Sequence, residues 1–183
     1  LLADRGGVLW AGSASEGLAR FDTLTERWTF LHHDPAVPGS ITPGAVQRLA
    51  RAHDGRIWVG LLGGLDRLDP TTGSFEHFRA GDASGLPDDR IGALLVDREG
   101  DLWVGTGHGL ARLRAGGQRF ESIEGGWAVN ALAQGVDGRI WVGTRDGRLL
   151  LLDREARVAP RSLQAGGGTR PSPVLSRLGP AEG

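Results

Sequence analysis

The sequence contains no cysteine and no lysine, and it does not begin with methionine. Without cysteine, disulfide bonds, thiolate zinc sites and thiol catalysis are excluded. No stretch approaches the roughly 18 apolar residues of a membrane-spanning helix, since the longest leucine run, residues 149–152, has four. A charged start followed by a long apolar core is also missing, so we predict neither a signal peptide nor membrane contact by this segment.

Charge of one sign is not in excess either. The 21 basic residues, all arginine, are matched by 22 acidic residues, which gives a formal net charge of −1. A nucleic-acid binder is expected to be strongly basic, so no nucleic-acid partner is predicted, and the balance does not point to an anionic partner. Glycine, in contrast, accounts for 31 of 183 residues, against an average usage of about 7%. This excess is typical of a chain with many tight turns.

One short phrase occurs four times. It consists of an Asp/Gly turn, a tryptophan between apolar residues and a glycine two positions after the tryptophan. The tryptophans are 48, 45 and 38 residues apart, which is the length of one propeller blade. The repeated positions are Trp10, Trp58, Trp103 and Trp141 with Gly12, Gly60, Gly105 and Gly143.

Each repeat contains signals for four strands. An apolar segment precedes the Asp/Gly turn and the tryptophan strand, and a glycine-rich turn then leads to a GLxRLD strand and an aromatic strand. Such runs bounded by Gly, Asp and Pro are strand signals. We predict an all-β fold, an incomplete β-propeller of about four four-stranded antiparallel blades that is open at both ends. The repeats are placed at about 1–44, 45–88, 89–126 and 127–153, and residues 154–183 are a loose tail or the truncated start of a fifth repeat.

The repeated residues themselves are assigned to the fold. One tryptophan per blade at a fixed position is expected to pack between sheets rather than to stack on a ligand. The Asp-Gly pairs are expected to form hairpin turns. A calcium loop would need several oxygen ligands around one cation, whereas only one or two carboxylates occur per turn. We therefore predict no metal site and no cofactor.

Ligand-binding candidates are sought on one rim. In a meander, the turns between second and third strands share a rim with the connectors between blades. Side chains there that break the repeat are candidates, because the fold does not require them. The predicted ligand-binding residues are Glu16, His32, Asp34, His108, Trp127, Arg145 and Asp146. His33 adjoins His32, but neighbouring strand residues point to opposite faces, so no metal or acid–base site is expected from this pair.

The phrase D-x-x-G-x-L/I-W-V-G-T, followed by G-L-x-R-L/F-D and the connector HHDPAVPGSITPGAVQRL at residues 32–49, resembles the two-component regulator propeller repeat. The resemblance extends from residue 1 to about 153. It implies a periplasmic ligand-sensing segment of an inner-membrane bacterial receptor, with a histidine kinase or diguanylate cyclase as output. The implied partners are an unknown small ligand, with carbohydrate as one option, the remaining blades of the same chain, and a second copy in a homodimer of the full receptor.

Motifs that carry catalysis are missing. The sequence has no P-loop, HExxH, CxxC or nucleophile elbow, so we predict no catalytic residues in this segment. Two alternatives stay open: a propeller enzyme similar to streptogramin lyases, whose blades also carry a DG-x-I/L-W signature, and a protein-interaction scaffold. Flanking sequence discriminates among them. A membrane helix followed by a kinase or cyclase selects the sensor, a stop after a seventh blade selects the lyase, and further repeats alone favour the scaffold.

Overall fold

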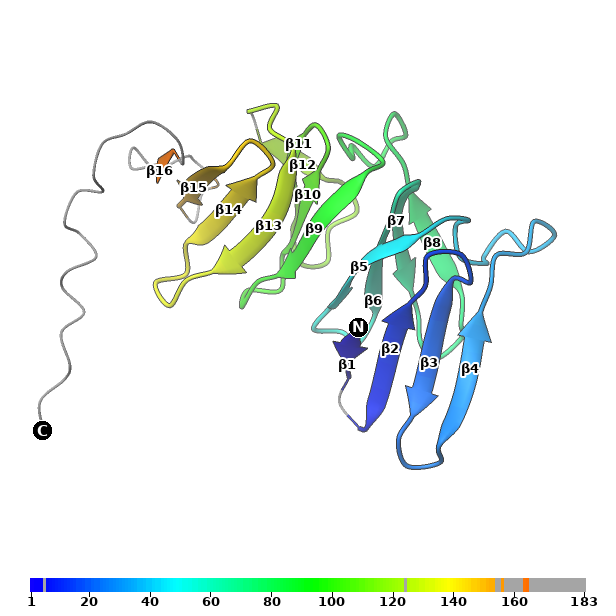
Figure 1. Cartoon of the computed structure of the whole chain (residues 1–183). Helices are drawn as coiled ribbons and strands as arrows, with labels where there is room; N and C mark the ends of the chain where they lie inside the picture. Colours follow the sequence, from blue (N-terminus) through cyan, green and yellow to red (C-terminus); the bar gives the residue numbers. More distant parts are fainter. Residues whose placement is uncertain (5, 124, 154–155, 157–162, 165–183) are drawn as a thin grey trace, which may run out of the picture.

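A computed structural model of the 183-residue chain describes residues 1–4, 6–123, 125–153, 156 and 163–164. These residues form four antiparallel sheets of four strands each, with the strands of every sheet in sequence order, and the described part contains no helix. Figure 1 shows the sheets standing side by side in an arc that does not close. The structure confirms the predicted all-β, incomplete propeller with four four-stranded antiparallel blades.

The four sheets follow one another along the chain. The first consists of β1 (Leu2–Ala3), β2 (Val8–Gly12), β3 (Leu18–Asp22) and β4 (Arg27–Leu31). The second consists of β5 (Val46–Arg51), β6 (Ile57–Leu61), β7 (Gly64–Leu68) and β8 (Phe75–Phe78). The third consists of β9 (Ile91–Val96), β10 (Leu102–Thr106), β11 (Gly109–Leu113) and β12 (Glu121–Ile123). The fourth consists of β13 (Val129–Gln134), β14 (Ile140–Thr144), β15 (Arg148–Leu152) and β16 (Leu163–Gln164).

The first strands of the blades lie at a common axis. β5 contacts β9 and β9 contacts β13, while β1 lies beside β5. The later strands of each blade run outwards from this line (Figure 1). The outer strand of the fourth blade, β16, falls within the segment 154–183, and the remainder of that segment, apart from residue 156, lies outside the described residues.

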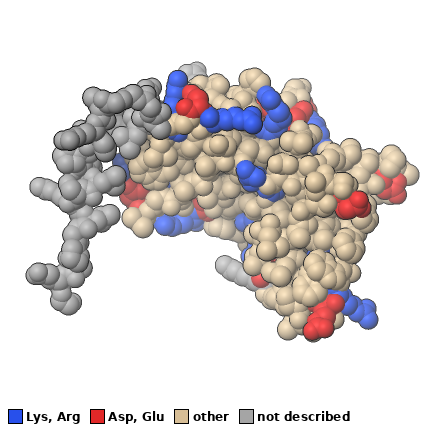
Figure 2. All heavy atoms as spheres, viewed as in Figure 1, with Lys and Arg blue, Asp and Glu red and all other residues tan. Residues whose placement is uncertain are grey.

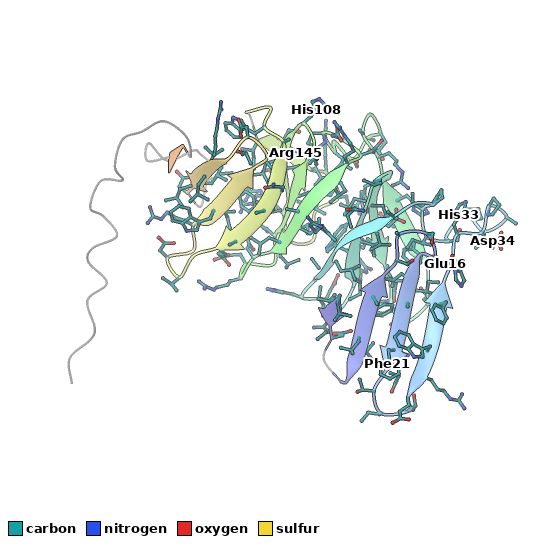
Figure 3. The ribbon with its side chains drawn as sticks, viewed as in Figure 1. Glu16, Phe21, His33, Asp34, His108 and Arg145 are labelled. Atoms are coloured by element: carbon teal, nitrogen blue, oxygen red, sulfur yellow. The ribbon has the colours of Figure 1, made fainter. Side chains whose placement is uncertain are left out.

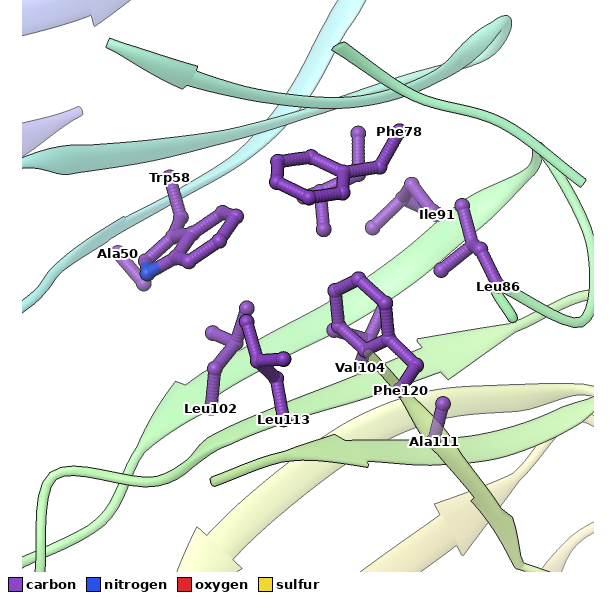
Figure 4. Packing of buried hydrophobic residues seen from close by; sticks show 11 residues of the cluster. Ala50, Trp58, Phe78, Leu86, Ile91, Leu102, Val104, Ala111, Leu113 and Phe120 are labelled. Carbon is purple, nitrogen blue, oxygen red and sulfur yellow. The ribbon is translucent and has the colours of Figure 1, made fainter. Parts of the chain in front are cut away.

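The repeated tryptophans are packed between blades. Trp58 is 4% exposed and shares one core cluster with Leu102 and Val104 of the next blade (Figure 4). Successive strand residues point to opposite faces, so a tryptophan strand presents its ring to one neighbouring blade and its two flanking residues to the other. The same arrangement joins the other neighbours, with Trp10 against Ile57 and Val59, and Trp103 against Ile140 and Val142. These three rings are buried between blades, whereas Trp141 is half-buried.

The repeated glycine makes room for the next blade. A Cβ on Gly60 would lie 2.6 Å from Cγ2 and 3.0 Å from Cβ of Ile91, the first residue of β9. Equivalent close approaches join Gly12 to Val46 and Gly105 to Val129. These distances are shorter than ordinary van der Waals contact, so any larger residue must displace the neighbouring strand. Tryptophan and glycine thus build the interface between blades together.

The arginine of the GLxRL strand lies beside the tryptophan. Arg67 pairs with Trp58 across β6 and β7, and its guanidinium lies 5.2 Å from the centre of the indole ring. Arg112 and Trp103 form the same cross-strand pair, with the guanidinium 5.0 Å from the centre of the indole ring. Both distances are within cation–π range. In the fourth blade, Leu151 is the cross-strand partner of the tryptophan instead. In the first blade Arg20 is likewise the cross-strand partner of Trp10, and the cation–π contact is observed in the second and third blades.

The aspartates of the repeat shape the turns, as predicted. Asp54 accepts a hydrogen bond of 3.0 Å from the backbone N–H of Arg56. Asp97 makes more contacts. Its carboxylate accepts hydrogen bonds from two backbone N–H groups of the turn and, at 2.7 Å, from Nε1 of Trp103. Asp97 is 5% exposed, so this carboxylate satisfies a buried indole donor as well as the turn.

Replacing Gly60 with alanine tests the close approach of the blades. We expect Gly60→Ala to lower the free energy of unfolding by about 1–3 kcal/mol, the usual cost of overpacking. Gly63→Ala is the matched control, since a Cβ there meets its nearest atom, Cγ2 of Thr42, at 3.7 Å. Urea unfolding of both variants provides the measurement, and equal losses of stability would contradict this account of the interface.

The role of Asp97 is tested by Asp97→Ala. Removing the carboxylate leaves the buried indole N–H of Trp103 without this acceptor, which is expected to cost about 1–3 kcal/mol. Asp54→Ala, at an exposed turn, is expected to cost less. Thermal unfolding followed by tryptophan fluorescence distinguishes the two variants. If Asp54→Ala proved as destabilising as Asp97→Ala, the indole contact would not be the important one.

Candidate functional site

One rim of the arc is built in the same way in three blades. The turn after each second strand donates a backbone hydrogen bond to the segment that leads into the first strand of the same blade. The three bonds run from Leu62 to Ala45 at 3.3 Å, from Gly107 to Arg90 at 3.0 Å and from Arg145 to Ala128 at 2.7 Å. These turns and connectors therefore lie together on one rim, as the meander topology predicts.

The first strands carry a β-bulge at this rim. The pairing of β5 with β6 skips Gln47, and the pairing of β13 with β14 skips Asn130. Between β9 and β10 the skipped residue is Gly92. Bulges redirect side chains and are frequent next to functional sites. Here all three bulged residues line one groove.

This groove, which we call the rim groove, has a volume of about 410 Å³ and is lined by residues of the second, third and fourth blades. Its lining contains no aspartate or glutamate. Figure 2 shows several arginine side chains, with acidic side chains among them, along the same edge of the molecule. The charged and amide-bearing residues of the rim groove are Gln47, Arg48, Arg90, His108, Asn130 and Arg145.

A carboxylate beside the rim groove holds two of these side chains. Asp88 forms an ion pair of 3.2 Å with Nε of Arg90 and a short hydrogen bond with Nδ1 of His108. Partial burial acts to raise the pKa of Asp88, but hydrogen bonds from Arg90 and His108 outweigh it and lower this pKa to about 2. Because an ionised carboxylate only accepts, Nδ1 of His108 carries the proton. Asp88 thus offsets one positive charge of the groove at neutral pH.

The structure brings some of the predicted ligand-binding residues together and separates others. His108 and Arg145 both line the rim groove (Figure 3). Asp146 is directed elsewhere, since it accepts a hydrogen bond from the Thr144 hydroxyl and pairs with Arg148 at 3.0 Å. The first of these bonds lowers the pKa of Asp146.

Glu16, His32 and Asp34 lie at the first blade, away from the rim groove, as Figure 3 shows for Glu16 and Asp34. The carboxylate of Asp34 accepts from the backbone N–H of Ala36 at 2.9 Å, and its carbonyl accepts from Ser40. This residue therefore shapes the connector.

Packing accounts for two of the remaining aromatic candidates. Trp127 is half-buried against the core between the third and fourth blades. His32 stacks on Phe30 with ring centres 5.9 Å apart. A ligand role for either residue stays a prediction.

Sequence reasoning did not find Gln47, Arg48, Arg90 or Asn130. The sequence does contain a signal for Gln47 and Asn130. Each directly follows an apolar residue that recurs at the same position of the repeat. The bulge itself depends on how β5 and β13 pair with their neighbours, which the sequence alone does not reveal.

Two features are absent from the described ranges. No three histidine, aspartate or glutamate residues among them are grouped closely enough to hold a metal ion. In the same part of the chain, no helix is long and apolar enough to cross a membrane.

The chain is similar to known proteins in sequence and in structure. Residues 85–108 match the family described as two component regulator propeller. The matched segment runs from the connector before β9 to the turn after β10, and it includes Asp88, Arg90 and His108. No curated protein matches the chain.

Solved structures share the fold. The extracellular domain of BT3049 from B. thetaiotaomicron, assigned to a hybrid two-component system, matches with a TM-score of 0.73 and 22% identity over 86% of this chain and 22% of that one. The extracellular domain of BT4673 from the same organism, also assigned to such a system, matches with a TM-score of 0.69 and 23% identity. This match covers 85% of this chain and 21% of that one. A protein assigned as a gluconolactonase matches with a TM-score of 0.59 and 20% identity. The match covers 85% of this chain and 59% of that protein.

The chain spans about a fifth of the length of the two extracellular domains. At these identities the likeness shows the fold alone. Residues 85–108 match the two-component regulator propeller repeat, and the fold around them is shared with these extracellular domains.

Proposed function

We propose that the chain is part of the extracytoplasmic ligand-sensing region of a bacterial signal-transduction receptor, either a two-component histidine kinase or a diguanylate cyclase. Support comes from the repeat matched at residues 85–108 and from the shared fold of extracellular domains assigned to two-component systems. A periplasmic location, an inner-membrane anchor and packing against further blades of the same chain belong to this proposal.

The rim groove is the proposed ligand site. The observation that carries this assignment is the bulge repeated in β5, β9 and β13, whose skipped residues all line the groove. Gln47 and Asn130 are exposed, so the packing between blades does not account for them. Side chains that the fold does not require, gathered in a concave site, are what a binding function needs.

The position of the groove suggests how binding is transmitted. A ligand in the rim groove touches three blades at once, whereas the blades otherwise contact only their immediate neighbours. Such a ligand favours the relative arrangement of the blades to which it binds most tightly, and it shifts the population toward that arrangement. The propeller would in this way convert occupancy of its rim into a change of shape.

Binding, rather than catalysis, suits the groups in the groove. The hydroxyl of Thr106 is buried and donates to the carbonyl of Gly109, which removes it as a nucleophile. The His108–Asp88 pair has the geometry of a general base, but no hydroxyl or thiol nucleophile lies within hydrogen-bond reach of it among the described residues. The arginine and amide groups are suited to hold and orient a ligand.

Thermal unfolding of the protein in the presence of oligosaccharides and small organic acids tests this proposal. A ligand of the rim groove is expected to raise the melting temperature, because it binds only the folded state. The double variant Gln47→Ala/Asn130→Ala is expected to weaken its affinity about tenfold, as expected for the loss of one or two hydrogen bonds.

Gln118→Ala is the matched control, since Gln118 is an exposed amide residue in a different groove. Two outcomes would refute the ligand site in the rim groove: ligands whose affinity does not change in the double variant, or binding of a protein to this rim without any small ligand.

A further inference from the structure

The rim groove concentrates positive charge in a chain whose net charge is negative. Three arginines and one histidine line it without any acidic residue, although the whole sequence has a formal net charge of −1. Another groove provides an internal comparison. It is lined by three arginines together with Asp54 and Glu99, so acidic residues of the lining offset most of its positive charge. Positive charge in the rim groove is therefore a local feature rather than a consequence of composition.

Two of the three arginines are available to a ligand. The guanidinium of Arg48 donates to the carbonyl of Gln47 at 2.8 Å, and no carboxylate in the described part of the chain forms an ion pair with it. Arg145 likewise has no ion pair within the ranges that the structure describes. Its neighbour Asp146 is already bound to Arg148 and Thr144. Both arginines are exposed, so binding an anion does not require an existing ion pair to break.

The third arginine is fixed in place. Asp88 holds Arg90 through its Nε and Nη2 atoms at 3.2 and 3.3 Å, and it raises the pKa of Arg90 further. Because Asp88 offsets the charge of Arg90, Arg48 and Arg145 leave positive charge in excess at the groove. The arrangement combines one oriented guanidinium with two that lack a partner acid.

We propose that the rim groove binds an anionic ligand, whose carboxylate or sulfate groups are held by Arg48 and Arg145. This inference rests on the proposed function and specifies the ligand class of the same site. Guanidinium groups match carboxylate and sulfate oxygens with two parallel hydrogen bonds. The amides of Gln47 and Asn130 lie in the same lining and offer donors and acceptors to neutral parts of the ligand.

Other anionic partners fit the groove less well. A nucleic acid is bound through stacking platforms and an extended basic surface. The lining of the rim groove contains no phenylalanine, tyrosine or tryptophan, and the chain as a whole is not basic. A small or oligomeric organic anion matches both the size and the charge of the site.

Paired probes that differ only in charge provide the test. Trigalacturonate is compared with galactotriose of the same linkage, and a sulfated galactotriose forms a third arm. Binding to the complete protein is measured by isothermal titration calorimetry at low and high ionic strength. We expect at least one anionic probe to bind about tenfold more tightly than galactotriose and to lose affinity as salt screens the charges. The preference between the two anionic probes distinguishes carboxylate from sulfate.

Single substitutions locate the binding. Arg48→Gln and Arg145→Gln are each expected to weaken the anionic probes by about five- to tenfold without changing the affinity for galactotriose. Arg56→Gln is the control, because the side chain of Arg56 is 43% exposed and lines the other groove, which also contains Asp54 and Glu99. Since Arg48 and Arg145 are exposed, the melting temperature without ligand should not change, which shows that the variants are folded.

The outcomes separate the two proposals. The anionic preference is refuted if galactotriose binds as tightly as the charged probes, if no anionic probe binds, or if both glutamine variants bind the anionic probes normally. If a neutral ligand binds and Gln47→Ala/Asn130→Ala abolishes that binding, the ligand-sensing proposal stands without the anionic preference. If no probe of either kind is affected by any rim groove variant, both proposals fail.

Discussion

The packing of each tryptophan against the next blade is the interaction on which the rest of this structure depends. Trp58 illustrates it: its ring fills the space between β6 and β10, while Gly60 in the same strand leaves room for Ile91. The large side chain of Trp58 and the missing side chain of Gly60, two positions later, thus fix the distance between neighbouring sheets and their position relative to each other. Because the contact recurs between all three pairs of neighbouring blades, the first strands converge on one axis, and the rim groove exists only as a consequence of that convergence.

The same strands serve packing along most of their length and binding at one end. β5 and β13 contribute apolar residues to the interfaces between blades, but each carries a bulge at the rim, where the side chains of Gln47 and Asn130 no longer follow the pleat. The bulge allows a polar residue to follow an apolar one that packs between blades without placing an amide in the core. Propellers can in this way keep a constant framework while the residues at their rim vary.

Most of the fold was predictable from the sequence, because the repeated residues are the ones that pack. Trp58 and Gly60 recur since every blade needs them. The candidate site was predictable only in part. His108 and Arg145 stand out as departures from the repeat, yet Glu16 satisfies the same criterion and lies at another blade. A position on the rim does not tell where around the axis a residue lies. Arg48 could not be found, since net charge conceals a local cluster and the bulge depends on strand pairing.

The central claim is that tryptophan packing brings three blades to one axis and so assembles a positively charged groove from residues distant in sequence. The most direct measurement is a crystal structure of the protein with bound trigalacturonate. The account predicts that the indole of Trp58 lies between β6 and β10 and that a ligand carboxylate contacts Arg48 or Arg145. A ligand bound only at a different groove, or Trp58 exposed to solvent, would contradict it.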